Sequence, residues 1–360
     1  MAARLDDIPE PVRATLAGAS LSRHFGLEGF RPAREAPAYA ALDLGTNNCR
    51  LLIARPALEQ GERGFRIVDA FSRIVRLGDG VSRTGMLNEA AIERTLAALE
   101  ICRDKMMARA VLRARLIATE ACRAAGNGAA FLASVRRHTG LSLEVVDQRT
   151  EAHLAAEGCA SLADPEAEAA VLFDIGGGSS EIVWLGRDHR SGAKRVKLWV
   201  SLKLGVVSLC EQFGGVDVTV EMFEAMVAHV ARQLRPFARR AMRERRCPRF
   251  HLLGTSGTVT TLAGLHLDLP RYDRRFVDGL WMEQDEVDAA MNRLRAMPYR
   301  ERAAHGCIGA DRADLVLAGC AIFEAIRRAF PSPRIRIADR GLREGLLMQM
   351  MGADQAWSGL

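Results

Sequence analysis

Residues 171–185 read VLFDIGGGSSEIVWL, and their types and spacing suit phosphate binding. The short apolar runs at the two ends predict strands joined by a tight turn. The three glycines carry no Cβ, so a phosphate oxygen can approach the backbone N–H groups of the turn directly. Asp174 and Glu181 flank the turn, and two carboxylates repel a phosphate unless a divalent cation such as Mg²⁺ lies between them. The stretch therefore predicts a phosphate cradle with a metal. The alternative, a glycine turn in a buried hairpin, explains neither the third glycine nor both acids.

The same pattern occurs earlier in the chain, where residues 41–56 read ALDLGTNNCRLLIARP. Asp43 and the glycine two positions later match Asp174 and its first glycine without a gap, and the apolar residues 51–53 fall opposite residues 182–184. Unless this match is a coincidence, it predicts two halves of similar build, each offering an Asp-x-Gly turn to one cleft.

A third stretch, GTSGTVTTL at residues 254–262, follows a predicted strand and opens a helix, so its free N–H groups suit a second anion site. It is not a nucleophile elbow, because Ser256 is followed at once by Gly257. The chain lacks G-x-x-x-x-G-K-[ST], which excludes a P-loop NTPase. The triple glycine also fails the dinucleotide-binding pattern, because Glu181 occupies the place of the third glycine and a strand follows.

The composition is that of a water-soluble globular protein. At 360 residues and 49% hydrophobic content the chain is long enough for two domains. A net charge of +6 favours polyanionic partners without identifying nucleic acid, and we expect no DNA partner. The eight cysteines show no C-x-x-C spacing, so we expect free thiols in a reducing cytoplasm. An apolar leader and an apolar run of about 20 residues are both absent, so we expect neither a secretory signal nor a membrane span.

The periodicities predict alternating strands and helices in two lobes. We expect an N-terminal extension at 1–38 that could be partly disordered, a first lobe at 39–165, a hinge near 161–169 and a second lobe at 166–342. We also expect a closing helix, residues 343–360, that packs back on the first lobe. Helices are predicted at 88–110, with Asn88 as N-cap, and from Thr150 and Thr219. Pro236 should kink or end the last of these. The arginine-rich run at 235–249 is interpreted as a solvated helix face, with polyanion contact as the alternative. Other strands are predicted at 115–119, 142–146, 195–201, 250–253 and 334–338.

Motifs in several separate segments resemble, in order, those of the exopolyphosphatase and guanosine pentaphosphate phosphatase (Ppx/GppA) family. The resemblance covers roughly residues 39–350. The motifs that carry it are Asp43-Leu-Gly-Thr-Asn, Ala118-Thr119 with Arg123 and Asn127, Glu151-Ala152, DIGGGSSE, Gly205-Val-Val with Glu211, GTSGTVTTLA, Arg312-Ala-Asp314 and Asp339-Arg-Gly-Leu-Arg-Glu-Gly.

The resemblance implies an α/β protein with the two-lobed actin, sugar-kinase and heat-shock ATPase (ribonuclease H-like) fold, with duplicated hairpin phosphate loops and an interlobe cleft. It implies hydrolysis of the terminal phosphate of polyphosphate, or of the 5′ γ-phosphate of guanosine pentaphosphate, with Mg²⁺ or Mn²⁺, and a homodimer. By position, Glu151 would be the general base and Arg123 the phosphate-binding arginine, and Asp43, Asp174 and Glu181 would organise the metal. The phosphate-binding residues would be Gly45, Thr46, Asn47, Gly176, Gly177, Gly178, Ser179, Ser180, Gly254, Thr255, Ser256 and Gly257.

The sequence departs from the family pattern beside these residues. Asn48 and Glu120 stand where serines are common, Asp147 and Gln148 replace a Ser-Gly pair before the helix that bears Glu151, and the C-terminal helical domains of longer members are missing. Two other functions therefore stay open. One is a kinase-like ATPase of the same fold. The other is a non-catalytic sensor that binds guanosine tetraphosphate or polyphosphate, although the intact Glu151, Asp174 and Glu181 favour an enzyme.

Overall fold

The computed structural model describes residues 36–358, except 60, 189–193 and 244–248. Residues 1–35 of the predicted extension, residues 1–38, lie outside the described residues. The first strand already begins at Ala38. The predicted arginine-rich run at 235–249 also falls partly outside the described residues.

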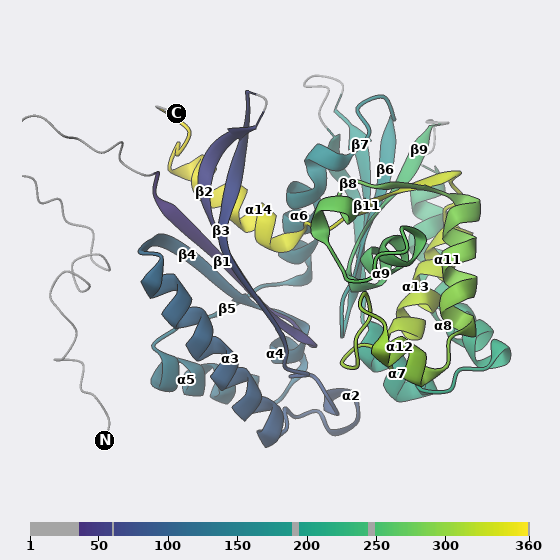
Figure 1. Ribbon diagram of the computed structural model, residues 1–360, viewed down its shortest axis with the longest axis horizontal. Coiled ribbons are helices and arrows are strands. Elements are labelled where there is room, and N and C mark those ends of the chain that lie inside the picture. Colours follow the sequence, from purple (N-terminus) through teal and green to yellow (C-terminus); the bar gives the residue numbers. More distant parts are fainter. Residues whose placement is uncertain (1–35, 60, 189–193, 244–248, 359–360) are drawn as a thin grey trace, which may run out of the picture.

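Two sheets with one strand order form the framework of the protein, and Figure 1 shows them side by side. In each sheet a central strand (β1 or β6) has an antiparallel hairpin on one side and parallel strands on the other, so the order β3-β2-β1-β4-β5 repeats as β8-β7-β6-β9-β11, with β10 added at the edge. The first sheet contains β1 (Ala38–Leu44), β2 (Asn48–Glu59), β3 (Glu62–Ile74), β4 (Val111–Ala118) and β5 (Glu144–Val145). The second contains β6 (Ala169–Ile175), β7 (Ser180–Arg187), β8 (Lys194–Leu202), β9 (Phe250–Thr255), β10 (Trp281–Glu283) and β11 (Arg334–Ala338).

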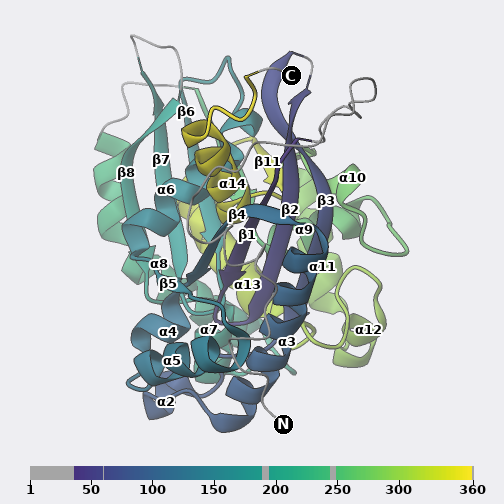
Figure 2. The same ribbon diagram turned by 90° about the vertical axis from the view of Figure 1, so that its left-hand side faces the viewer.

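Helices cover the sheets on their outer faces and between the lobes (Figures 1 and 2). They are α2 (Val81–Thr84), α3 (Glu89–Ala108), α4 (Glu120–Ala124), α5 (Gly128–Thr139), α6 (Gln148–Cys159), the 3₁₀ turn η2 (Ala160–Leu162), α7 (Val206–Phe213), α8 (Val220–Arg243), α9 (Gly257–His266), α10 (Arg274–Val277), α11 (Gln284–Ala296), α12 (Tyr299–Ala304), α13 (Val316–Ala329) and α14 (Leu342–Ala353). In the part of the chain that the structure covers, no helix combines the length and apolar character needed to cross a membrane.

The C-terminal helix α14 returns from the second sheet to the first. It packs against β1 and α6, and Leu346, Leu347 and Met350 share a buried cluster with Tyr39 and Leu52 of the first sheet. The chain therefore crosses between the sheets twice, once through the connection from α6 to β6 and once between β11 and α14.

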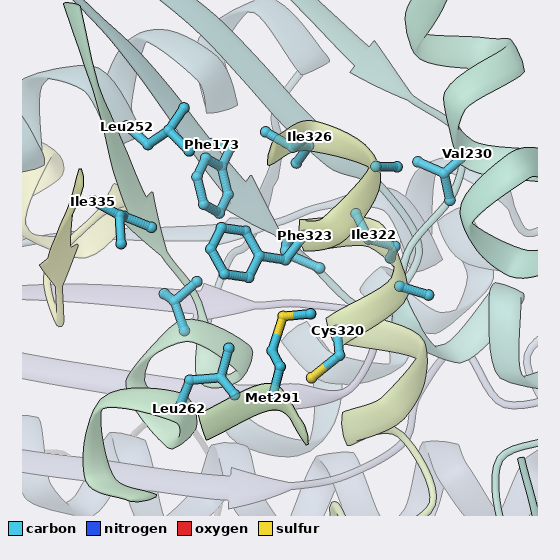
Figure 3. Close-up of a cluster of buried hydrophobic side chains, with 14 of the residues drawn as sticks. Phe173, Val230, Leu252, Leu262, Met291, Cys320, Ile322, Phe323, Ile326 and Ile335 are labelled. Atoms are coloured by element: carbon cyan, nitrogen blue, oxygen red, sulfur yellow. The ribbon is translucent and has the colours of Figure 1, made fainter. Parts of the chain in front are cut away.

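The central strand of the second sheet is buried on both faces, which is why its apolar residues form a continuous run instead of alternating. Phe173 points toward α13, where its ring stacks on Phe323 at 5.4 Å between centroids (Figure 3). Leu172 faces the opposite side and packs with residues of α6. This packing fixes the end of β6, where Asp174 lies.

Helix α3 begins as predicted, since the Asn88 side chain accepts a hydrogen bond from Ala91 N at 2.8 Å. Of the two outcomes predicted at Pro236, a kink or an end of the helix, the end is excluded, because α8 continues to Arg243. Pro236 is exposed, so water can satisfy the carbonyl that loses its partner, while the buried residues Leu234 and Phe237 hold the helix on both sides of it.

Polar contacts join the lobes on one side of the cleft. Glu211 of α7 accepts hydrogen bonds from Gly80 N, at 2.7 Å, and from the Ser82 hydroxyl. The Arg76 guanidinium pairs with Asp314 at 3.0 Å. These contacts tie the loop after β3 to the second lobe.

Candidate active site

Two aspartates occupy equivalent positions near the ends of the two central strands. Asp43 of β1 lies opposite Arg50 of β2, and Asp174 of β6 lies opposite Glu181 of β7, with the same seven-residue spacing in both hairpins. The hairpin predicted to occur twice is therefore confirmed in register. The copies differ in charge, because the first sets a carboxylate against a guanidinium and the second pairs two carboxylates.

The turns of the two hairpins are built alike and touch each other. Gly45 N donates to Asn48 O and Gly176 N donates to Ser179 O, both at 2.9 Å. A Cβ placed on Gly177 would lie 2.9 Å from Thr46 Cβ, and one on Gly178 would lie 2.7 Å from Thr46 Oγ1. The second and third glycines therefore let the loops of the two lobes approach each other.

A cavity of about 140 Å³ lies between the lobes at this contact. Both predicted glycine turns and the predicted carboxylates line it. The predicted residues that it brings together are Asp43, Gly45, Thr46, Asn47, Glu151, Asp174, Gly176, Gly177, Gly178, Ser179, Glu181, Ser256 and Gly257.

Three predicted phosphate-binding residues do not line this cavity. The Ser180 hydroxyl is buried and donates to Leu204 O at 2.8 Å. Gly254 faces the core, where a Cβ would lie 2.6 Å from the Phe173 ring. Thr255 donates to Arg340 O at 2.8 Å and lines only an adjoining chamber. Gly254 and Thr255 are consecutive residues of β9 and therefore face opposite sides of the sheet, one toward the core and the other toward Arg340.

Glu151 lies in the first turn of α6, where it is 6% exposed. Asp147 caps this helix by accepting from Thr150 N at 2.7 Å, so the departure from the family pattern at this position supplies an N-cap. Arg123 Nη1 donates to Glu151 Oε1 at 2.5 Å and to Val146 O at 2.6 Å.

Most donors of Arg123 are engaged by protein groups. Its Nε donates to Glu120 at 3.1 Å, and its Nη2 also donates to that carboxylate. The cavity lining includes Glu151 but not Arg123. In this structure the Arg123 guanidinium therefore orients Glu151. Glu120, which is another departure from the family pattern, holds that guanidinium in place.

Burial raises the pKa of each carboxyl group that faces the cavity. The pKa of Asp174 rises to about 7, and those of Asp43, Glu151 and Glu181 are raised by the same loss of solvation. The groups also repel one another: Asp43 raises the pKa of Asp174 and of Glu151, and both of these raise that of Glu181. The charges of Arg50 and Arg343 lower the pKa of Asp43 and Asp174, and a bound cation would act in the same direction.

The donor set fits a divalent metal that is completed by water and substrate. Among the residues that the structure describes, no three His, Cys, Asp or Glu side chains converge closely enough to hold a metal alone. Mg²⁺ usually keeps several waters and takes one or two carboxylates plus substrate phosphates. Asn47 Oδ1 is buried without a partner at the same loop, which adds a further oxygen.

A larger chamber of about 690 Å³ adjoins the cavity, and residues that line both include Asp43, Arg50, Asp174, Ser256 and Arg312. Arginines from both lobes line it, and four of them make no ion pair within the described parts of the chain: Arg50, Arg73, Arg312 and Arg343. Burial and the nearby charge of Arg50 lower the pKa of Arg312. Arg50 and Arg312 are half-buried guanidiniums that form no ion pair among the described residues, an arrangement that suits an anion.

Sequence reasoning did not select these arginines. A signal for Arg50 was present, because the gap-free match of the hairpins places it where the second copy has Glu181. Arg312 lay in a family motif but had no assigned role, because its distance from the cavity depends on how the second lobe folds.

Two α/β lobes of repeated topology that meet at paired glycine turns define the class of actin, the sugar kinases and the heat-shock ATPases. The model of the Ppx/GppA phosphatase family matches residues 57–354. The chain belongs to the Ppx/GppA phosphatase family, and it is a hydrolase.

Curated relatives cover most of this chain. Exopolyphosphatase 2 of Mycobacterium tuberculosis is 28% identical over 332 residues, which are 87% of this chain and 98% of that protein. A guanosine-5′-triphosphate,3′-diphosphate pyrophosphatase of Aeromonas hydrophila is 28% identical over 320 residues, 88% of this chain but only 60% of its own length.

Solved structures agree with the fold. The Ppx/GppA family member of Aquifex aeolicus has a TM-score of 0.71 and 29% identity, with 88% of this chain and 98% of that chain covered. An exopolyphosphatase of Cytophaga hutchinsonii has a TM-score of 0.77 at 24% identity over 88% of this chain and 98% of its own, a likeness of fold.

Proposed function

We propose that this protein releases the terminal phosphate of inorganic polyphosphate, or the 5′ γ-phosphate of guanosine pentaphosphate, by attack of water. The observation that carries the proposal is a cleft whose small cavity is lined by four carboxyl groups and by Arg50 and Arg312, and whose adjoining chamber adds further arginines. A substrate with one reacting phosphoryl group and a long or multiply charged remainder fits both parts. The names of the curated relatives point to the same substrates.

Glu151 would take the proton from the attacking water. Its carboxylate lies in the cavity with Asp174 and Glu181. Its raised pKa lies closer to neutral pH, and a general base is most effective when its pKa is near the working pH. Arg123 would fix its orientation from behind, because that guanidinium is bound to Glu151 and Glu120. Phosphoryl transfer needs this positioning and charge neutralisation more than covalent help.

The glycine turns would hold the reacting phosphoryl group through their backbone N–H groups, with Thr46 and Ser179 adding hydroxyls. Asp43, Asp174 and Glu181 would bind Mg²⁺ or Mn²⁺ together with water and substrate oxygens, and the metal would neutralise charge on the phosphoryl oxygens. The remainder of the substrate would lie along Arg50 and Arg312.

Phosphate release from the purified full chain tests the proposal. With Mg²⁺ present, we expect release from long or short polyphosphate or from guanosine pentaphosphate well above release from ATP. Release from ATP alone, or transfer to an acceptor, would instead identify a kinase-like ATPase. Tight binding of guanosine tetraphosphate or polyphosphate without any release would identify a sensor.

A pair of arginine variants tests the division of the cleft. Arg312→Met should raise KM for polyphosphate by about tenfold or more, because a buried charge-assisted contact with phosphate is lost. Arg103→Met is the matched control, since Arg103 lies on α3 and pairs only with its neighbour Asp104. An unchanged KM in Arg312→Met would contradict the assignment of the chamber.

Location and assembly belong to the same proposal. The described cysteines, at positions 49, 102, 122, 159, 210, 307 and 320, are free thiols, which suits a reducing cytoplasm. The homodimer that the resemblance implies also stays a prediction, and sedimentation of the purified protein measures it.

A further inference from the structure

A second pocket lies at the outer end of the second sheet and shares no lining residue with the cleft. It encloses about 620 Å³. One wall is the connection from α6 to β6, residues 161–167, and the other contains Trp281 of β10 with Arg334 and Arg336 of β11. The pocket therefore adjoins the segment that links the helix bearing Glu151 to the strand bearing Asp174.

Arg336 has no polar partner at this pocket. In the described parts of the chain it makes no hydrogen bond or ion pair, and its Nε is buried without an acceptor. Leaving a buried donor of a charged group unsatisfied is costly. Burial lowers the pKa of Arg336; the charges of Asp164 and Asp278 raise it, and those of Arg334 and Arg340 lower it.

The two arginines are held by rigid neighbours. Arg336 lies directly opposite Trp281 in the pairing of β10 with β11, and its guanidinium carbon is 5.0 Å from the centroid of the Trp281 ring. Arg334, two residues earlier on the same face of β11, is 4.2 Å from that centroid. The Trp281 ring in turn meets His251 edge to face at 5.0 Å. Little ordering remains to be done when an anion binds.

Several other polar groups of the pocket are already matched, whereas the lining residues Glu166 and Arg249 are exposed to solvent. Asp164 pairs with Arg334 at 2.7 Å, and its backbone N–H donates to His251 Nε2 at 3.1 Å. Burial lowers the pKa of His251, and its Nδ1 bonds Leu252 O, so the ring is neutral. Arg336 is therefore the arginine beside Trp281 that forms no ion pair among the described residues, because Asp164 pairs with Arg334 and Asp278 with Arg340.

We propose that this pocket is a second anion site, separate from the cleft, that binds a phosphate group through Arg336 with Arg334 beside it. A guanidinium fork matches the oxygens of phosphate, and a phosphate has enough oxygens to accept from both arginines while Arg334 keeps Asp164. Such a ligand would brace the connection between the lobes, because Asp164 anchors that connection to β9 and β11. The site does not depend on the reaction proposed for the cleft.

Calorimetric titration of the full chain with orthophosphate tests the proposal. Wild type and the cleft variant Arg312→Met should both bind orthophosphate at this pocket, whereas Arg336→Met should lose that binding by at least tenfold and Arg336→Lys should retain part of it. Arg328→Met is the control, since this exposed arginine pairs with Glu224 and Glu324 away from the pocket.

A parallel titration with a nucleoside 5′-monophosphate identifies the source of the phosphate group, because the tighter ligand of the two is the better fit to the pocket. Circular dichroism verifies folding, and Arg334→Met replaces Arg336→Met if the latter does not fold. Wild-type affinity and stoichiometry for both probes in the folded variant would overturn the proposal.

Discussion

Replacing Glu151 by glutamine removes one negative charge from the cleft and keeps the shape of the side chain. If Glu151 is the general base, the rate should fall by about 10²–10⁴-fold, which corresponds to roughly 3–5 kcal/mol of transition-state stabilisation. The fold should survive. The amide oxygen of glutamine can still accept a hydrogen bond from Arg123, and Arg123 keeps its ion pair with Glu120. The substitution also removes one of the carboxylates that repel one another in the cleft. Weakening one charge-assisted hydrogen bond costs about 1 kcal/mol, so Tm should shift by no more than about 4 °C.

The assay is steady-state phosphate release with Mg²⁺ on the preferred substrate, together with thermal unfolding. Glu157→Gln is the matched control, because Glu157 lies on the same helix but accepts from Gln349 Nε2 at the surface, and it should keep wild-type turnover. Turnover of Glu151→Gln within a few-fold of wild type would refute the role of base. Loss of cooperative unfolding would show instead that the residue holds the lobe together.

Further outcomes follow from the electrostatics and the lobe contacts. Burial raises the pKa of Glu151, and the charge of Glu120 raises it further, so kcat/KM should decline with falling pH well above the ordinary glutamate range near 4. Glu120→Gln should move that decline to lower pH. An unchanged pH profile in this variant would show that Glu120 does not affect the titration of Glu151. The folded-state pKa of Asp174, about 7, exceeds its unfolded value, so the metal-free protein should lose stability as pH rises from about 4 through 7. Mg²⁺ should therefore raise Tm more at pH 8 than at pH 5. Equal increases in Tm at both pH values would exclude metal binding beside this carboxylate. Arg76→Met should leave the free energy of unfolding nearly unchanged, because the ion pair with Asp314 is only partly buried. It should raise the rate of amide hydrogen exchange in the loop after β3. An unchanged exchange rate would show that other contacts hold the lobes together.

Sequence patterns predicted the build of the two hairpins because that build is local. The spacing between Asp174 and Glu181 fixes which residues face each other across a tight turn, and the same spacing fixed the pair of Asp43 with Arg50. Asn88 was recognisable as an N-cap for the same reason, since its partner lies three residues away. The repeat then implied two halves of similar build.

Properties that depend on distant parts of the chain were not predictable in this way. The contact of Arg123 with Glu151 arises only when α4 and α6 lie side by side, and no spacing reveals that Glu120 then occupies the rest of the guanidinium. Strand β3 was missed because it is a partly exposed edge strand with several charged residues and no clear alternation. The role of Ser180 depended on where β7 begins, which decides the direction of its side chain.

The contact between the two glycine turns also constrains how this sequence can change over evolutionary time. Thr46 in one half occupies space that a side chain at Gly177 or Gly178 in the other half would need. A larger residue gained on one side is tolerated only if the opposite side becomes smaller, so mutations in the two halves are coupled although they lie about 130 positions apart. We expect positions 46, 177 and 178 to vary together or not at all, so the two hairpins should evolve as one coupled structural unit.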